Sequence, residues 1–310
     1  MEQASTILIT GGTGLIGTAL TKALIGNGHK VIILTRDPTS KKNLPENTTY
    51  AAWDIEKQTL DLKALQQADY IVHLAGAGIA DKRWTEKRKQ EIVDSRVKSG
   101  ELLVKTLKEN QHKVKAFISA SAIGWYGNDQ KTPHQHSFIE TDNAADDFLG
   151  NACRQWEASI QSVTALGIRL VVIRTGIVLS SQGGALKEFQ KPIRFGIAAI
   201  LGGGKQIISW IHIEDLVRIY MYALQNENFQ GVYNAVAPHP VSNKEFTIQL
   251  ARQMKGSFFV PVHVPVFVLK WMLGEMRTEV LKSATVSSKK IKSQDFTFQF
   301  PALAAALKNV

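Results

Sequence analysis

The sequence predicts an α/β protein built on a doubly wound parallel sheet, followed by a smaller C-terminal lobe. Two observations carry this prediction. Short apolar, β-branched runs alternate with amphipathic helical stripes through residues 1–175, as they do where crossover helices connect parallel strands. A glycine-rich turn joins the first run to the first stripe. From residue 176 to 310 this alternation is less regular, and these residues are expected to form the C-terminal lobe. At about 205–240 the chain is expected to return to the main sheet.

The glycine turn is the most informative stretch. Residues 6–10 are apolar and β-branched, three glycines follow in a GxxGxxG spacing, an apolar helical stripe covers 16–24, and a second apolar run lies at 31–34. Glycines tighten such a turn and let a pyrophosphate approach the backbone at the helix N-terminus. The unit predicts a Rossmann-like dinucleotide site. The cofactor contacts expected in the turn are Gly11, Thr13, Gly14, Leu15, Ile16 and Gly17.

The end of the second strand indicates which nicotinamide cofactor binds. A carboxylate at this point would hold a ribose 2′-hydroxyl, whereas an arginine suits a 2′-phosphate. The chain has Thr35 and Arg36 here, and its first acid, Asp37, comes one residue later. We therefore expect NADP(H) rather than NAD(H). The alternative is that Arg36 is simply a solvated residue at a strand end.

Alternation continues along the chain. The predicted elements are strands at 48–54 and 69–76, a helix at 86–110, a strand at 114–122, a helix from 147 and a strand at 168–179. Ligands of such sheets lie at the carboxyl ends of the strands. Asp54 is expected to meet an adenine amino group. Arg83 and Arg174 could each meet a phosphate or carboxylate. Trp84 could stack on a ring of the ligand. The other cofactor contacts expected at strand ends are Leu74, Ala75, Gly76 and Ser119.

Several motifs resemble those of a known family. "TGGTGLIG", "HLAG", "SASAIGWYG", "RTGIVL" and "SWIHIEDLVR" resemble the extended short-chain dehydrogenases/reductases, which include the NAD-dependent epimerases and dehydratases. "GIADKRWTEKRKQEIVDSR", "CRQWE", "QGGALK", "GEM" and "FTFQFPALAAAL" are similar to an atypical epimerase-like subfamily with a short C-terminal domain. The tail departs from that pattern, because Asp295 stands where a glycine is expected.

The resemblance implies a catalytic serine after the fifth strand and a Tyr-x-x-x-Lys pair on the next helix. Ser121 matches the serine, but Leu149 and Cys153 occupy the positions of the tyrosine and lysine. Leucine cannot transfer a proton. Together with Trp156 and Ile160 these residues form an apolar stripe, which is typical of a packed helix. We therefore expect Cys153 to be a buried small hydrophobe rather than a reactive thiolate.

Other residues must then move the proton. We expect Ser121 to polarise the substrate oxygen, and Tyr126, on the loop facing the cofactor, or a water to donate the proton. As an alternative, Tyr126 is only a wall residue. His212 could titrate near neutral pH, or could simply hydrogen-bond the helix that follows it. Asp146 and Asp147 are expected at a helix N-terminus.

The C-terminal lobe is expected to bind the substrate. The glycine-rich segment 180–206 suits a substrate loop or lid more than a packed sheet. A strand is predicted at 231–238, with Ser242 as the N-cap of the next helix. Residues 258–276 combine a proline-punctuated extended segment with an apolar helix. We expect this segment to form a domain core or a homodimer surface.

Composition limits the classes of partner. The net charge is +10, yet no nucleic-acid module accompanies it, so a phosphate-rich cofactor and a small anionic or sugar-like substrate explain the excess better. No apolar run reaches about 18 residues, and the chain has one cysteine. We expect a cytoplasmic protein without membrane, nucleic-acid or metal sites.

Two functions follow from these observations. The first is an NADP(H)-dependent oxidoreductase or epimerase-like enzyme, which the retained Ser121 favours. The second is a non-catalytic, NADPH-sensing regulatory protein, which the absent Tyr-x-x-x-Lys pair favours.

Overall fold

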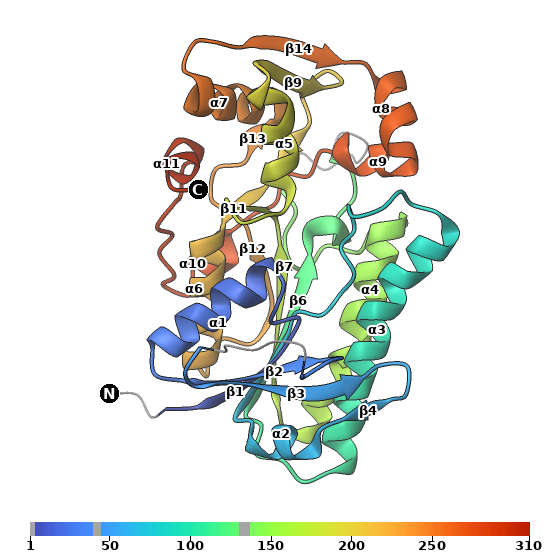
Figure 1. The fold of residues 1–310 in the computed structure, drawn as a ribbon, viewed down its shortest axis with the longest axis vertical. Helices are drawn as coiled ribbons and strands as arrows, with labels where there is room; N and C mark the ends of the chain where they lie inside the picture. Colours follow the sequence, from blue (N-terminus) through green and yellow to red (C-terminus); the bar gives the residue numbers. More distant parts are fainter. Residues whose placement is uncertain (1–3, 40–44, 130–136) are drawn as a thin grey trace.

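The structure is a computed structural model that describes residues 4–39, 45–129 and 137–310. Within these residues the main element is an eight-stranded sheet of order β12-β7-β6-β5-β1-β2-β3-β4 (Figure 1). Every neighbouring pair is parallel except β3 and β4. The strands are β1 (Thr6–Thr10), β2 (Lys30–Thr35), β3 (Thr48–Asp54), β4 (Thr59–Leu60), β5 (Tyr70–His73), β6 (Ala116–Ala122), β7 (Arg169–Thr175) and β12 (Gly231–Ala235). The predicted doubly wound α/β fold is confirmed.

Helices cover both faces of this sheet because its strands are apolar on both sides. On one face, Ile7 and Ile9 pack with α1 (Leu15–Gly26) and α6 (Ile213–Gln225). On the other face, Leu8 belongs to a core that includes α2 (Leu62–Gln67), α3 (Glu86–Glu109) and α4 (Phe148–Ile160). Figure 1 shows the two layers on either side of the strands. The strand order reverses between β1 and β5, so a ligand crevice is expected at their carboxyl ends.

Polar side chains begin the helices where the sequence indicates. Asp147 accepts a hydrogen bond from the Gly150 amide at the start of α4. Ser242 does the same for the Glu245 amide at the start of α7 (Asn243–Lys255). Both bonds satisfy amides that have no partner within the helix. The predicted N-terminal positions of Asp147 and Ser242 are therefore confirmed.

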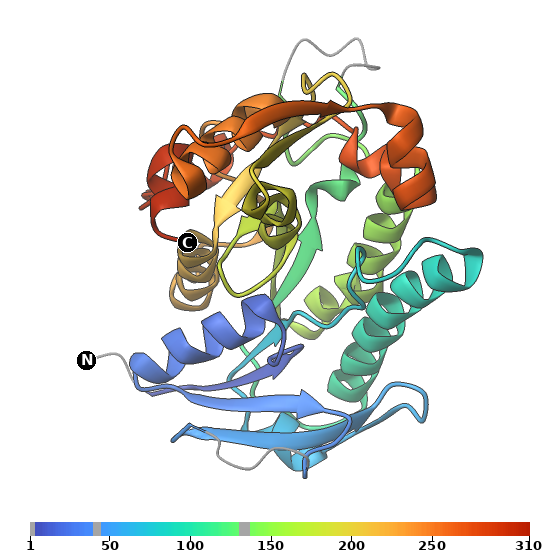
Figure 2. The same ribbon diagram turned by 45° about the horizontal axis from the view of Figure 1, so that its top comes forward.

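The second half of the chain forms a lobe with its own core (Figure 2). Trp210, Phe246 and Phe300 are buried in it among α5 (Ala185–Arg194), α7 and α11 (Leu303–Lys308). Between the parts of this lobe, α6 and β12 return to the main sheet. The remaining elements are η1 (Ile123–Trp125), η2 (Gln161–Leu166), β8 (Ile177–Leu179), β9 (Ile197–Leu201), β10 (Ile207–Ile208), β11 (Trp210–His212), β13 (Val241–Ser242), β14 (Val260–Val264), α8 (Val266–Leu273), η3 (Gly274–Met276), α9 (Arg277–Val280) and α10 (Lys289–Lys292).

Two predicted segments differ from the structure. The single strand at 168–179 is wrong, because the chain breaks at Gly176 and β8 leaves the main sheet to pair with β11. A Cβ at Gly176 would lie 2.7 Å from the Ser209 carbonyl oxygen, so this crossing requires glycine. The segment 180–206 is also more regular than expected: it contains α5, and β9 pairs with β14. Local periodicity could not predict either feature, because the break at Gly176 is one residue long and the strand that pairs with β9 lies about sixty residues further along the chain.

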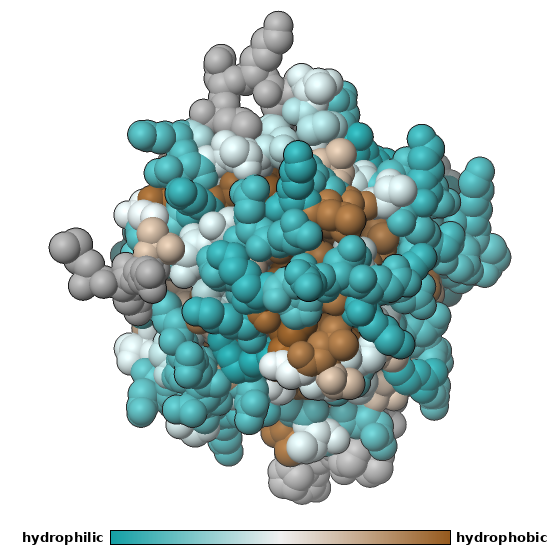
Figure 3. Space-filling model, turned by 90° about the horizontal axis from the view of Figure 1, so that it is seen from below, coloured by the Kyte–Doolittle hydropathy of each residue, from teal (hydrophilic) through white to brown (hydrophobic). Residues whose placement is uncertain are grey.

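The surface gives two further observations. Seen from below, the molecule presents a largely hydrophilic face with a few hydrophobic residues between charged side chains (Figure 3). On the C-terminal lobe, β14 and α8 leave apolar side chains in solvent, among them Val260, Phe267 and Trp271. None of the helices in the described ranges has the length and apolar character that crossing a bilayer requires.

We predict that Gly17→Ala destabilises the protein through the glycine turn. A Cβ at Gly17 would lie 2.3 Å from the Gly11 carbonyl oxygen and 2.6 Å from the Gly12 Cα, so backbone would have to move. The free energy of unfolding in urea should fall by about 2 kcal/mol. The matched control is Gly26→Ala in the same helix, where a Cβ meets nothing within 4 Å; it should stabilise the protein by up to about 1 kcal/mol. Equal effects at the two positions would contradict a closely packed turn.

Candidate functional site

The glycine turn is locked against the end of β5. Gly11 has a φ of +67°, and the Gly14 amide donates to its carbonyl at 3.0 Å. A Cβ at Gly11 would lie 2.8 Å from the Leu74 carbonyl. Thr10 Oγ1 accepts from the amides of Leu74 and Ala75, each at 3.1 Å. The structure therefore brings together two of the predicted cofactor segments, the glycine turn and the tail of β5.

The N-terminus of α1 is open. Its N-cap is Gly14, which has no side chain to accept from the first-turn amides. Those amides and the helix dipole form a site for an anion. Leu15, in the first turn, also approaches the second lobe, because a Cβ at Gly184 would lie 3.1 Å from its Cδ2. The segment after β8 therefore lies beside the glycine turn.

The ends of β2 and β3 carry the residues expected near the adenosine. Arg36 is exposed, and no described residue forms a hydrogen bond or ion pair with its side chain. Thr35 Oγ1 is 3.4 Å from the Asp37 amide. Asp54 Oδ1 accepts from the Glu56 and Lys57 amides at 3.0 Å, and these bonds lower the pKa of its carboxyl group. Arg36 is thus available to bind an anion. One oxygen of Asp54, in contrast, already accepts hydrogen bonds from the backbone of the turn that follows β3.

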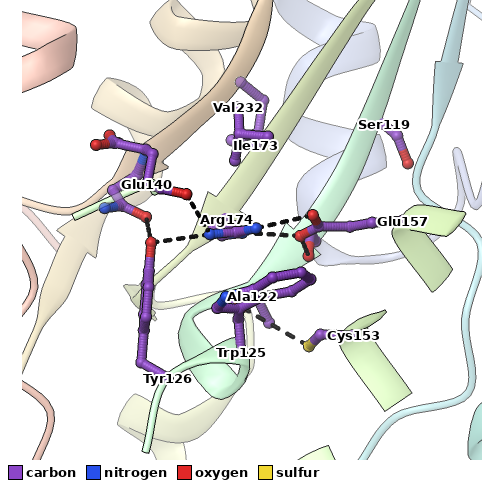
Figure 4. Close-up of polar contacts among 12 residues, drawn as sticks. Ser119, Ala122, Trp125, Tyr126, Glu140, Cys153, Glu157, Ile173, Arg174 and Val232 are labelled. Atoms are coloured by element: carbon purple, nitrogen blue, oxygen red, sulfur yellow. Dashed lines mark hydrogen bonds and ion pairs between the residues drawn. The ribbon is translucent and has the colours of Figure 1, made fainter. Parts of the chain in front are cut away.

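Arg174 lies at the centre of a buried polar network (Figure 4). Its Nε and Nη2 donate to the two Glu157 oxygens at 2.8 and 2.9 Å, in a bidentate pair. Its Nη1 donates to Tyr126 Oη and to the Glu140 carbonyl, both at 3.1 Å. The guanidinium also lies 3.6 Å from the Trp125 ring centroid. The expectation that Arg174 meets a ligand phosphate or carboxylate is therefore corrected, because its partner is a carboxylate of its own chain.

The two serines of β6 are both buried and have different partners. Ser121 Oγ donates to Glu157 Oε1 at 2.6 Å, and Ser119 Oγ donates to the Ala120 carbonyl at 3.0 Å. A hydroxyl has only one hydrogen. While Ser121 donates to Glu157, it can only accept a further hydrogen bond, for example from a substrate hydroxyl.

Tyr126 does not face the cofactor side as expected. Its side chain is fully buried, its Oη donates to Asn234 Oδ1 at 2.7 Å, and its ring stacks on Phe138. Burial raises the pKa of Tyr126 to about 12, so the phenol is a poor proton donor at neutral pH. The alternative interpretation, a wall residue, agrees better with this placement.

Leu149 and Cys153 point toward the end of β6. A Cβ at Gly124 would lie 3.2 Å from Leu149 Cβ and 3.8 Å from Cys153 Sγ. Both side chains are buried, and burial raises the pKa of the Cys153 thiol to about 12. A thiol at that pKa is neither nucleophilic nor ionised. The predicted role of Cys153 as a buried small hydrophobe is confirmed.

The loop before α3 has a role that the sequence did not indicate. Trp84 is buried, donates from Nε1 to the Ile79 carbonyl and packs edge-on against Phe148. It is therefore a core residue and not a stacking platform. Arg83 is exposed and donates to the Trp271 carbonyl at 2.6 Å. This bond ties the loop to α8 of the second lobe.

His212 also has a structural role. Its Nδ1 lies 3.3 Å from the Glu214 amide and caps α6, while burial lowers the pKa of the imidazole. Sequence reasoning missed Glu157, although the acid stands one helical turn after Cys153 in "CRQWE". An acid beside an apolar stripe, with an arginine at the end of the next strand, was the available signal.

Comparison with known proteins now identifies the family. Residues 7–235 match the NAD dependent epimerase/dehydratase family. The chain belongs to this family. Residues 264–310 match a domain of unknown function, DUF1731. A relative from Bacillus subtilis (strain 168), the epimerase family protein YfhF, is 35% identical over 305 residues, covering 98% of this chain and 97% of the relative.

Solved structures of the family have the same architecture. The human epimerase family protein SDR39U1 (isoform 2), crystallised with NADPH, is 30% identical with a TM-score of 0.84, covering 98% of each chain. A nucleoside-diphosphate sugar epimerase from Corynebacterium glutamicum is 31% identical with a TM-score of 0.76; the match covers 98% of this chain and 57% of that one. Both similarities extend over the sheet and the C-terminal lobe.

We predict that Cys153→Lys, which places a lysine where the resemblance expects one, destabilises this protein. The side chain at this position is 5% exposed, and Glu157, the nearest carboxylate on α4, is already paired with Arg174. Burial of an uncompensated ammonium should lower the free energy of unfolding by about 3 kcal/mol. Cys153→Ala should cost no more than about 1 kcal/mol. A lysine variant as stable as the wild type would show that the slot still accepts a cation.

We predict that His73 makes stability depend on pH. Its Nδ1 lies 2.8 Å from Thr10 Oγ1, and burial lowers its pKa to about 4. Between this value and about 6.5 the unfolded chain binds the extra proton, so stability falls as the pH falls. The loss should approach about 3 kcal/mol at pH 4. Urea unfolding of His73→Gln should show a shallower slope across this window; an unchanged slope would contradict the assignment.

Proposed function

We propose that this protein is an NADP(H)-dependent oxidoreductase of the epimerase type. The observation that carries the proposal is the closely packed glycine turn beneath an uncapped helix N-terminus, with an arginine at the end of the neighbouring strand that no described residue pairs. The human relative crystallised with NADPH, 30% identical over 98% of the chain, supports the same cofactor here. The strand-end arginine and the helix N-terminus fit the two anionic parts of NADP(H), the 2′-phosphate and the pyrophosphate.

The residues suggest how the cofactor would be held. The first-turn amides of α1, from Leu15 to Gly17, would bind the pyrophosphate. Arg36, supported by Thr35, would bind the 2′-phosphate, and the tail of β5, from Leu74 to Gly76, would lie against the nicotinamide half. Asp54 would meet the adenine amino group through Oδ2, which in the structure lies 3.7 Å from Lys57 Nζ. When bound, NADP(H) would supply or accept a hydride.

Ser121 and Glu157 would handle the proton. In the direction of oxidation, Ser121 Oγ would accept the hydrogen bond of a substrate hydroxyl while its own hydrogen is held by Glu157 Oε1, 2.6 Å away. The proton would pass from the substrate hydroxyl to Ser121, and from Ser121 to Glu157. This transfer would take the role that the tyrosine has in the family resemblance. In the direction of reduction the same pair would run in reverse: Glu157 would take up a proton from a water, and Ser121 would pass a proton to the carbonyl oxygen of the substrate. Tyr126 is a weaker candidate because it is buried and bonded on both sides of its hydroxyl.

The substrate is proposed to be a small anionic or sugar-like molecule. The net charge of +10 and the exposed Arg83 at the junction of the two lobes support an anionic ligand. The relative named as a nucleoside-diphosphate sugar epimerase supports a sugar-like one. The exposed apolar side chains of β14 and α8 support a homodimer through this face. A single cysteine, buried and un-ionised, suits a reducing cytoplasm.

An NADPH-sensing regulatory protein is the second candidate. The apolar replacements Leu149 and Cys153 favour it, because they leave no tyrosine-lysine pair on α4. The two functions are separated by hydride loss from NADPH deuterated at nicotinamide C4. Transfer of the label to any carbonyl substrate supports the enzyme, whereas a partner protein retained only by the NADPH-loaded form supports the sensor.

We predict that Arg36→Ala selectively weakens NADPH binding. Fluorescence titration of the wild type should give tight binding of NADPH and weak binding of NADH, because only NADPH offers a 2′-phosphate to the guanidinium. The variant should lose about tenfold to a hundredfold in affinity for NADPH and little for NADH. Lys30→Ala, an exposed cation at the opposite end of β2, is the control. Equal losses for the two nucleotides, or no binding to the wild type, would overturn the proposal.

A further inference from the structure

Arg96 of α3 reaches the place where β5, the following loop and α4 meet. Its Nη1 donates to the Ala77 carbonyl at 3.0 Å and to the Ile92 carbonyl at 2.9 Å. Its guanidinium carbon lies 5.0 Å from the Trp156 ring centroid. The side chain is half-buried. The planar cation is therefore held in one orientation by two carbonyls and an aromatic ring.

This guanidinium lies against the tail of β5. A Cβ at Gly76 would be 2.9 Å from Arg96 Cζ and 3.2 Å from its Nε. A side chain at Gly76 would therefore have to displace the end of the Arg96 side chain. The cation is in contact with the backbone against which the nicotinamide half is proposed to lie.

Arg96 also lies beside Cys153, the position at which the resemblance expects a lysine. Its positive charge acts to lower the pKa of the Cys153 thiol, although burial raises that pKa by more. Cys153 is the residue that stands at the lysine position. The site has therefore lost a cation from α4 and holds a different cation, from α3, beside the same position.

The arginine retains hydrogen-bonding capacity. Only Nη1 is bonded, and neither Nε nor Nη2 has a hydrogen-bond partner among residues 4–39, 45–129 and 137–310. Nε carries one N–H and Nη2 carries two, in a rigid fork that suits adjacent hydroxyl oxygens. A lysine at position 153 would compete with this fork for space and charge.

We propose that Arg96 binds the ribose hydroxyls of the nicotinamide half of the cofactor, and so replaces the absent lysine from a different helix. This inference rests on the proposed function, since it requires that a nicotinamide dinucleotide binds at this edge of the sheet. It assigns Arg96 to the nicotinamide half, as Arg36 is assigned to the adenosine half. The two arginines should therefore respond differently to ligands that lack one half.

A purely structural role is the competing interpretation, and the chain offers a matched control for it. Arg88, two turns earlier in α3, donates to the carbonyl of Gly78 in the same loop and is buried. If Arg96 only held the loop in place, loss of Arg88 should have the same effect on ligand binding as loss of Arg96.

The test compares Arg96→Met, Arg96→Lys and Arg88→Met in equilibrium titrations with NADPH, NADH and 2′,5′-ADP, the last of which lacks the nicotinamide half. Arg96→Met should weaken NADPH and NADH by the same factor, about tenfold, as expected for loss of charge-assisted hydrogen bonds. Its affinity for 2′,5′-ADP should be unchanged. Arg96→Lys should recover part of the loss, and it keeps the test informative if the methionine variant does not fold.

Three outcomes would overturn the inference: unchanged affinities in a folded Arg96→Met protein, an equal loss for all three ligands, or the same selective loss in Arg88→Met. Failure of the proposed function gives a different result, because the wild type would then bind neither NADPH nor 2′,5′-ADP. Wild-type binding of NADPH with no effect at Arg96 would leave the cofactor assignment intact and remove only the role of this arginine.

Discussion

The buried pair of Arg174 and Glu157 is the interaction that organises the carboxyl ends of β6 and β7, where the site is proposed. Its two N–H···O bonds join the end of β7 to α4, and the same carboxylate accepts from Ser121 at the end of β6. Arg174 in turn holds Tyr126 and stacks on Trp125. Removing one member of a buried pair typically costs about 3–5 kcal/mol, because the other charge is left unsolvated. The pair therefore holds α4 against the ends of β6 and β7, at the edge of the sheet where the cofactor is proposed to bind.

The two halves of the proposed cofactor site have different characters. The adenosine half keeps the arrangement that dinucleotides require: a glycine turn, an open helix N-terminus and a strand-end arginine. The proposed nicotinamide half has buried apolar side chains at Leu149 and Cys153, and the guanidinium of Arg96 reaches it from α3.

Much of the fold was predictable because it depends on local pattern. Short stretches of sequence were enough to predict three features. These are the strand-turn-helix unit at residues 6–24, the caps Asp147 and Ser242, and the apolar stripe of α4. The contacts of the site were harder to predict, because they depend on pairs distant in sequence. Tyr126 is buried by Asn234 and Phe138, and Arg174 is neutralised by Glu157. No spacing rule places these partners together, so both residues were expected to face the ligand.

The most direct test is a crystal structure of the protein grown with NADPH. The account predicts the pyrophosphate at the N-terminus of α1, the 2′-phosphate beside Arg36, and the nicotinamide ribose within hydrogen-bond distance of Arg96, with the ring near Ser121. A nucleotide bound in this order would establish the site and leave only the substrate to be found. A nicotinamide half directed away from Ser121, or a 2′-phosphate with no contact to Arg36, would contradict the account.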